Sequence, residues 1–371
     1  MRPPPAIVRR TVLDPLWIPL AVCLALLLLV VSAGGTLVAP LSRRRRLPRF
    51  CLFAALYLVV NASLVLWCAG CWLRFPFPRR RDPARWSRLH QATLRRALAL
   101  MVGAARPLLG FRVELQEPPD HDQIAGRPLL LLARHGGPGD SFALVQLLLS
   151  RYQRRPAIVL KETLRWDPGL DLLLGRLPSC FIRRGEGKAP ERLAALARTM
   201  NRDDAILLFP EGGNWTPGRH SRAIARLLHA GRRQAAADAA ENRNVLPPQP
   251  TGMLACMSGR ADLTVAVVAH TGLEDLVTPA LVWSALPVTS PMIVRWWFQP
   301  ARSLPATDDG RREWLRLQWA LVDSWIDARK AARTGVMVPA DATGVAADVE
   351  AADVETAEVE APLASTGADE L

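Results

Sequence analysis

The pattern of hydrophobic and polar positions divides this chain into unequal parts, and the first part is the most apolar. Two uncharged runs, 16–41 and 50–73, follow each other closely. Each is long enough to cross a hydrocarbon core of roughly 30 Å as a helix. A cleaved signal peptide does not fit, because the first run is too long and a second follows at once. We therefore expect residues 1–80 to form N-terminal membrane segments, at about 16–41 and 50–73, arranged as an embedded helical hairpin.

After this hairpin, short apolar runs alternate with helical patterns. Strands are predicted near 127–133, 157–161, 205–209, 263–269 and 291–298, with an edge strand at 111–116. Helices are predicted near 86–105 (ending before Pro107), 140–151, 188–201, 219–239 and 311–332. This alternation predicts an α/β fold, a mostly parallel sheet flanked by helices, over residues 86–332. Sites in such sheets gather where strands end and helices begin.

The last predicted helix and the tail after it differ sharply in character. Trp314, Leu317, Leu321, Trp325 and Ala328 form one stripe on the helix, and core packing is favoured over an interfacial membrane helix. Residues 334–371 carry nine acidic side chains and no basic one. This composition, without aromatic residues, predicts a disordered acidic tail.

Net charge and cysteine content narrow the partners. The chain carries a formal charge of +13 despite its acidic tail, so the remainder is strongly basic. Beside a bilayer, this favours anionic phospholipid headgroups as partners; we expect no nucleic-acid partner, because no nucleic-acid motif is present. The six cysteines do not form a framework: Cys68 and Cys71 lie in an apolar helix, and Cys180 and Cys256 lie in strand-like segments. The six histidines show no metal-ligand spacing, so no metal is expected.

The strongest chemical signal is a histidine and an aspartate that directly follow the apolar run 128–133. His135 and Asp140 are separated by a Gly-rich turn. An aspartate that accepts from one ring nitrogen fixes the histidine tautomer and leaves the other nitrogen free to take a proton. A histidine that only caps the turn is the alternative. A second apolar run, 205–209, leads into Pro210-Glu211-Gly212 and repeats the arrangement of a strand followed by a single charged residue.

Together these two blocks resemble the signatures of the glycerolipid acyltransferases, the family of lysophosphatidic acid acyltransferase-like enzymes. That family carries His-x4-Asp first and Phe-Pro-Glu-Gly about seventy residues later. The segments 161–164, with Pro168 and Gly175, and 181–184 resemble its intervening blocks, and 245–252 resembles its late proline block in the form seen in the lysocardiolipin and acyl-lysophosphoinositide branch. The resemblance covers about residues 90–330, with four blocks in order.

The resemblance implies a function and roles for individual residues. His135 is the general base and Asp140 orients it, and the acceptor attacks directly with no acyl-enzyme. The substrate-binding residues implied are Pro210, Glu211, Gly212, Lys161, Arg184 and Arg219. Arg184 is the first choice for a phosphate; Arg219 is the second, because the Thr-Arg that often follows Glu-Gly is replaced by Gly213-Asn214. Backbone N–H groups at the next helix start are expected to stabilise the oxyanion, and the glycines after His135 to admit substrate.

The enzyme implied moves a fatty acyl chain from acyl-CoA or acyl carrier protein to a hydroxyl of a lysophospholipid or lysophosphatidic acid. It needs no cofactor beyond this co-substrate. Because such donors are cytosolic, we expect a cell-membrane protein, integral or monotopic, whose catalytic domain faces the cytoplasm. Arginines flank both apolar runs, so the positive-inside rule does not decide whether the segments span or re-enter.

Two other classes of protein remain to be weighed. A lipase would need a Gly-x-Ser-x-Gly nucleophile elbow, which the sequence lacks. The alternative from a different class is a non-catalytic membrane protein that binds lysolipid or acyl chains on the same fold. The intact His135, Asp140 and Glu211 argue against it.

Overall fold

The protein was analysed as a computed structural model, which describes residues 2–38, 45–74, 82–118, 124, 126–137, 139–183, 185–274, 276 and 278–334. The chain forms two compact units, 1–323 and 324–371. The first contains every strand of the described chain; the described part of the second is the end of the last helix, up to residue 334. The predicted acidic tail falls almost entirely on residues outside the described chain.

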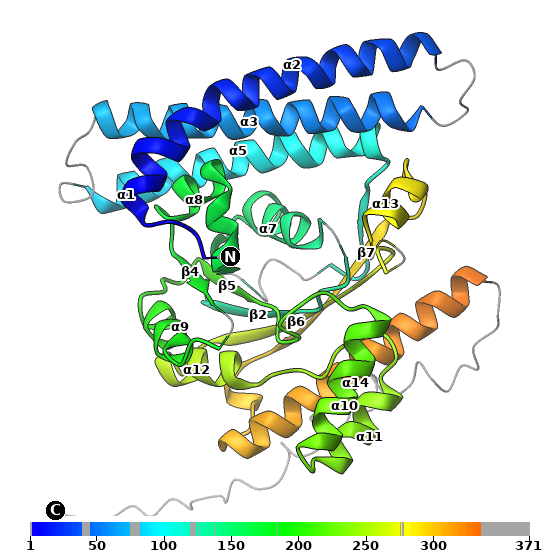
Figure 1. Ribbon diagram of the computed structural model, residues 1–371. Helices are drawn as coiled ribbons and strands as arrows, with labels where there is room; N and C mark the ends of the chain where they lie inside the picture. Colours follow the sequence, from blue (N-terminus) through cyan, green and yellow to red (C-terminus); the bar gives the residue numbers. More distant parts are fainter. Residues whose placement is uncertain are drawn as a thin grey trace, which may run out of the picture. The chain divides into compact units, whose positions relative to one another are not determined.

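The N-terminal region is helical, as its hydrophobic pattern predicts. α1 (Ala6–Val8), the π-helical η1 (Arg9–Leu13) and α2 (Asp14–Val38) follow one another without a break, and α3 (Arg46–Arg74) comes next. The helical stretches Ala6–Leu37 and Arg46–Arg74 are long and apolar enough to cross a membrane, by length and composition only. They lie beside a third long helix, α5 (Pro83–Leu109), on one side of the sheet (Figure 1).

A seven-stranded sheet carries the rest of the first unit, with the order β1-β7-β6-β2-β5-β3-β4 among the described residues. The strands are β1 (Val113–Leu115), β2 (Leu129–Ala133), β3 (Arg155–Lys161), β4 (Ser179–Ile182), β5 (Asp204–Leu208), β6 (Thr264–Thr271) and β7 (Met292–Gln299). Only the β6–β7 pair is antiparallel. The predicted α/β fold with a mostly parallel sheet is therefore confirmed.

Helices cover both faces of this sheet (Figure 1). The helices after α5 are α7 (Asp140–Ser150), α8 (Pro168–Leu174), α9 (Ala189–Arg198), α10 (Pro217–His229), α11 (Arg233–Glu241), α12 (Thr251–Gly259), α13 (Pro279–Ala285) and α14 (Asp308–Thr334), with short 3-10 turns η3 (Glu162–Trp166) and η4 (Ala301–Ser303). α7 lies on the face that also carries the three long helices, whereas α9 and α12 cover the other face. Every residue of β2, β5 and β6 is buried, because both faces are covered.

Two helix boundaries differ from the sequence prediction, each for a backbone reason. The helix expected to end before Pro107 continues through it to Leu109, because proline removes only one hydrogen bond in the final turn. That end is closed by Gly110, whose φ of 76° allows its N–H to bond back to the helix. The helix predicted over 219–239 is two helices, separated where Gly231 adopts a φ of 71°.

Two residue placements are also wrong. Cys256 lies in α12 rather than in a strand, although it is buried as expected of a packing residue. On α14, the buried apolar side chains of the first unit are Leu315, Trp319 and Val322, whereas Leu317 of the predicted stripe is 49% exposed; Trp325 of that stripe is buried. The buried face lies about one position from the predicted stripe, because tryptophans and leucines occur on more than one face of this helix.

Candidate active site

The site forms where three neighbouring parallel strands end. β6, β2 and β5 lie side by side, with Ala133 of β2 opposite Val268 of β6 and Leu132 opposite Leu208 of β5. Because the strands are parallel, their carboxyl ends meet at one edge of the sheet. His135 follows β2, Glu211 follows β5, and His270 is the last residue but one of β6.

His135 and Asp140 are in direct contact. The His135 Nδ1 atom lies 2.8 Å from Oδ2 of Asp140. The carboxylate accepts only, so Nδ1 carries the proton and Nε2 presents its lone pair. No hydrogen bond among the described residues involves that Nε2, and the side chain is 17% exposed. The ring also packs on Phe209, with centroids 4.6 Å apart. The geometry is that of an oriented base with one accessible nitrogen.

Asp140 is the first residue of α7 and is almost completely buried. Its Oδ2 also accepts from the N–H groups of Gly136 (3.0 Å) and Gly137 (3.3 Å), and its Oδ1 accepts from the backbone N–H and the hydroxyl of Ser141. Burial alone would raise the pKa of Asp140. The hydrogen bonds from His135 and then from His270 outweigh burial and hold that pKa well below its usual range. Asp140 is therefore ionised and can orient His135 throughout the neutral range.

The glycines after His135 serve the protein's own packing. A Cβ atom on Gly136 would lie 2.3 Å from the Arg134 guanidinium, and one on Gly137 would lie 2.7 Å from Leu273. The space into which a Cβ atom would point is therefore filled by protein, although both glycines also line the pocket described below, and their predicted role in admitting substrate stays a prediction. The N–H groups of Gly136, Gly137 and Ser141 donate to Asp140, and the predicted oxyanion donors at this helix start stay a prediction.

Glu211 connects the two signature blocks through backbone groups. Its carboxylate, on a residue only 4% exposed, accepts from the N–H groups of His135 (3.4 Å) and Leu246 (3.3 Å). Burial raises the pKa of Glu211 to about 8, against the opposing effect of Arg134. A further link joins the same loops, since the Trp215 N–H donates to the His135 carbonyl at 2.8 Å. Glu211 thus holds the backbone of the base in place, and its predicted contact with substrate stays a prediction.

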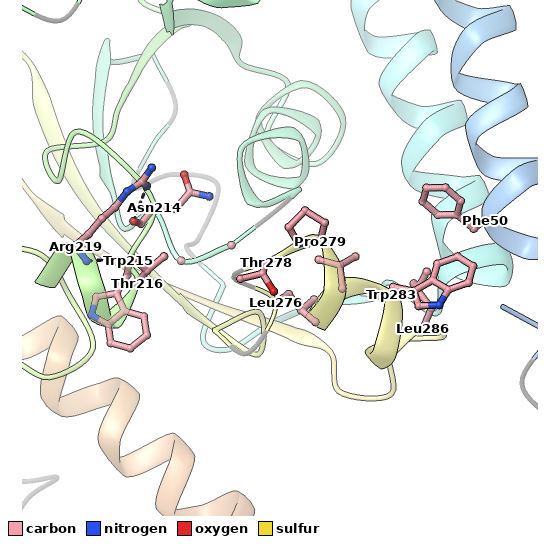
Figure 2. A pocket seen from close by; sticks show the side chains of 13 residues that line it. Phe50, Asn214, Trp215, Thr216, Arg219, Leu276, Thr278, Pro279, Trp283 and Leu286 are labelled. Atoms are coloured by element: carbon pink, nitrogen blue, oxygen red, sulfur yellow. Dashed lines mark hydrogen bonds between the residues drawn. The ribbon is translucent and has the colours of Figure 1, made fainter. Parts of the chain in front are cut away.

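A pocket of about 620 Å³ opens beside the His135 turn (Figure 2). Its lining residues are Phe50, Gly136, Gly137, Asn214, Trp215, Thr216, Arg219, Leu276, Thr278, Pro279, Val282, Trp283 and Leu286. Figure 2 shows the polar side chains of Asn214 and Arg219 at one end, and Phe50 and Trp283 at the other. Phe50 belongs to α3 and meets Trp283 of α13 edge to face, with centroids 5.7 Å apart. The pocket therefore joins a polar end to an apolar end at the N-terminal helices.

Of the remaining residues predicted to bind substrate, one lines the pocket and the others described lie outside its described lining. Arg219 lines the pocket, in the first turn of α10, and its Nη1 donates to the Asn214 carbonyl at 2.9 Å. Pro210 is buried and Gly212 is exposed with a φ of 67°, so both shape the turn around Glu211. Lys161 is exposed at the end of β3 and is outside the described lining of the pocket. The prediction for Arg184 lies outside the described residues.

Sequence reasoning did not single out two residues of this site. Arg134 is completely buried, and its Nη1 bonds to Glu274 and to the His270 carbonyl, both at 2.9 Å. His270 is also completely buried, with Nε2 3.4 Å from Asp140 Oδ2. The available signal was that His270, like His135, ends a predicted buried strand. Its proximity to Asp140 depends on β6 being the neighbour of β2, which the sequence pattern does not give.

Comparison with known proteins gives a family. Residues 112–251 match the family model described as Acyltransferase, which confirms the family resemblance drawn from the motifs; the branch stays a prediction. No curated protein matches the chain. Among solved structures, the chain is similar to the 1-acyl-sn-glycerophosphate (LPA) acyltransferase PlsC from Thermotoga maritima. The identity is 13% and the TM-score 0.49, over 77% of this chain and 99% of that one.

Proposed function

We propose that this acyltransferase, whose residues 112–251 match the family model described as Acyltransferase, transfers a fatty acyl group from acyl-CoA or acyl carrier protein to a hydroxyl of a lysophospholipid or lysophosphatidic acid. The observation that carries the proposal is the contact of 2.8 Å between His135 Nδ1 and Asp140, beside a pocket with one polar and one apolar end. Such a pocket suits an amphipathic substrate, whose headgroup and acyl chain need different surroundings.

The proposed step uses His135 as the general base. Its Nε2 takes the proton of the acceptor hydroxyl while the hydroxyl oxygen bonds to the thioester carbonyl carbon. The tetrahedral adduct then expels the thiolate as the C–S bond breaks, and the thiolate takes up the proton from the imidazolium. Asp140 keeps the ring tautomer and stabilises the imidazolium without itself taking a proton. No side chain of the enzyme is acylated.

The acceptor phosphate is assigned to the polar end of the pocket. Arg219 offers a guanidinium there, and the Thr216 hydroxyl caps α10 by accepting from the Arg219 N–H at 3.2 Å. Charge-assisted hydrogen bonds from arginine are the strongest available to a phosphate. The acyl chain is assigned to the end lined by Val282, Trp283 and Phe50. Glu211 supports this arrangement by fixing the backbone of His135.

We further propose a monotopic membrane association, with the catalytic domain on the cytoplasmic side. α3 contacts the catalytic domain near its start, middle and end: Arg46 donates to the Leu286 carbonyl (2.9 Å), Asn61 to Asp167 (2.6 Å), and Arg176 to the Cys68 carbonyl (2.9 Å). A helix held along its whole length by a polar domain is not surrounded by lipid.

The lipid-facing surface of the proposed hairpin is supplied by side chains pointing away from these contacts. The exposed large hydrophobic residues of α2 and α3 include Leu16, Leu20, Leu27, Val30, Leu37, Val59, Leu66 and Leu73. An apolar surface of this extent supports insertion into one leaflet. Helices that lie in one leaflet along the catalytic domain, instead of crossing the bilayer, keep the arginines at both of their ends on the same side, which removes the conflict with the positive-inside rule.

The experiment that tests the proposal is acyl transfer by purified full-length protein in detergent–phospholipid micelles. Radiolabelled acyl-CoA or acyl carrier protein is the donor, and glycerol 3-phosphate, lysophosphatidic acid and lysophospholipids with larger headgroups are the acceptors. Mass spectrometry separates acylated lipid from released fatty acid. A diacylated phospholipid product supports the proposal. Release of fatty acid alone would make the protein a thioesterase, and tight binding of acceptor without turnover would favour the lipid-binding alternative.

A further inference from the structure

The fully buried His270 is a titratable group that the mechanism above does not use. It is the last residue but one of β6, and its ring is 0% exposed. The pairing of Ala133 with Val268 places it beside the point where the chain leaves β2 for His135. Because this ring is completely buried, it does not meet the substrate.

The position of the ring proton follows from the neighbours of His270. Its Nε2 lies 3.0 Å from the Arg134 carbonyl oxygen and 3.4 Å from Asp140 Oδ2. Both atoms only accept, so Nε2 carries a proton. Nδ1 is buried and has no hydrogen-bond partner among the described residues. A bare lone pair there costs less than a buried N–H without an acceptor, which gives the tautomer with its proton on Nε2.

The backbone and a buried ion pair hold this ring in position. The Arg134 guanidinium donates to the His270 carbonyl at 2.9 Å and is itself paired with Glu274 at 2.9 Å and with the Asn244 carbonyl at 2.7 Å. On another side, a Cβ atom at Gly136 would lie 2.9 Å from His270 Cε1, so the turn that follows His135 packs directly on the ring. The His270 ring therefore has little room to turn away from Asp140.

We propose that His270 is a positioning residue for the catalytic pair: its Nε2–H holds the Asp140 carboxylate against His135 and offsets part of its negative charge, and so sets the basicity of His135. The inference rests on the proposed function. The two imidazoles meet the same oxygen, with His135 Nδ1 at 2.8 Å and His270 Nε2 at 3.4 Å. Asp140 thus shares its charge between an accessible base and a buried donor.

The proposal predicts a specific change in pH dependence. The ionisable groups around the pair are His135 and Asp140 on the β2–α7 turn, Arg134 at the end of β2, Glu274 after β6 and Glu211 after β5. When the His270 donor is removed, Asp140 stays ionised but attracts the proton of His135 more strongly. The imidazolium form then persists to higher pH, so the acid limb of the kcat/KM profile moves upward by about half a unit to one unit.

The test compares His270→Leu with His270→Gln in the full-length protein. Leucine fills the space without a donor, whereas the amide nitrogen of glutamine reaches about as far as Nε2 and can donate. We expect His270→Leu to lose roughly tenfold in kcat, the effect of one hydrogen bond to a charged group, with KM for the acceptor unchanged and the acid limb raised. His270→Gln should restore the wild-type limb. If the leucine variant does not fold, His270→Asn, whose amide is too short to reach Asp140, replaces it.

The matched control is His90→Leu, which removes another completely buried histidine. His90 bonds to the Trp86 carbonyl at 2.8 Å and lies on α5, outside the active site. The acid limb of the kcat/KM profile of His90→Leu should coincide with that of the wild type. The inference is overturned if the acid limb of His270→Leu does not move, or if that of His270→Gln moves as far as that of His270→Leu. In either case an active wild type leaves the proposed function standing. A wild type that acylates no acceptor overturns both.

Discussion

Replacing Asp140 with asparagine separates the charge of this residue from its size. The carboxylate accepts from His135 and two glycine N–H groups on one oxygen and from Ser141 on the other. An amide has one accepting oxygen, so whichever way it turns, its NH2 group faces hydrogen-bond donors. With the amide oxygen toward Ser141, His135 loses the acceptor that fixes its tautomer; with the oxygen toward His135, the ring keeps only a neutral acceptor, which stabilises the imidazolium less.

The expected magnitude follows from these contacts. Loss of one hydrogen bond to a charged group costs about 1.5–3 kcal/mol, or roughly 10- to 100-fold in rate. Loss of the correct tautomer removes general-base catalysis as well, which contributes about 10²- to 10⁴-fold. We expect kcat of Asp140→Asn to fall by about 10²- to 10⁴-fold, with KM for the acceptor nearly unchanged, because the Asp140 side chain is buried behind His135.

Steady-state acyl transfer measured over a range of acceptor concentrations provides both constants, and thermal unfolding shows whether the variant is folded. Asp262→Asn is the matched control: its carboxylate is mostly exposed and pairs with Arg260, two residues away. That variant should retain the wild-type rate. A folded Asp140→Asn protein with kcat within about threefold of the wild type would refute the role given to Asp140.

The remaining predictions concern three other acidic or basic groups. Burial raises the pKa of Glu211 in the folded protein from 4.5 to about 8, so between these pH values the folded state holds a proton that the unfolded chain releases. The free energy of unfolding should therefore fall as the pH rises from about 4.5 to 8, by at most ~1.4 kcal/mol per pH unit. Denaturant unfolding at pH 5 and pH 7 should show a smaller pH effect in Glu211→Gln, and an identical one contradicts the shift. Arg219→Ala should raise KM for a phosphate-bearing acceptor by roughly 10- to 100-fold with kcat nearly constant; an unchanged KM excludes Arg219 from the headgroup site. Asp171→Asn should lower thermal stability markedly, because three arginines reach this buried carboxylate within 3.0 Å, and an unchanged melting temperature would show that the packing of η1 does not depend on this cluster.

Much of the fold follows from local patterns in the sequence. Buried parallel strands read as continuous apolar runs, and residues 129–133 and 205–208 do so. Each of these strands leads directly into a Gly-containing turn with polar residues, which drew attention to His135 and Glu211. Helix ends were less predictable, because the structure closes them with glycines such as Gly231 and Gly110 whose conformations depend on the following loop.

The site could be predicted only where its parts are close in sequence. His135 and Asp140 lie on one turn, so their spacing suffices. His270 and Arg134 meet only because β6 is the neighbour of β2, and strand order is a long-range property that no local pattern gives. The same holds for Phe50, which reaches the pocket where α3 meets Trp283 of α13. Sequence reasoning also did not give the packing reason for Gly136, since the atoms that demand a glycine come from residues 134 and 270.

The central claim is that this chain is an acyltransferase in which His135 removes the proton of the acceptor hydroxyl. Its most direct test is the rate of acyl transfer by His135→Ala beside the wild type, on the acceptor that the wild type uses best. His229→Ala, an exposed histidine at the end of α10, is the matched control. The account predicts a loss of about 10²- to 10⁴-fold for His135→Ala in folded protein, and none for His229→Ala. A folded His135→Ala protein that transfers acyl groups at the wild-type rate would contradict the account.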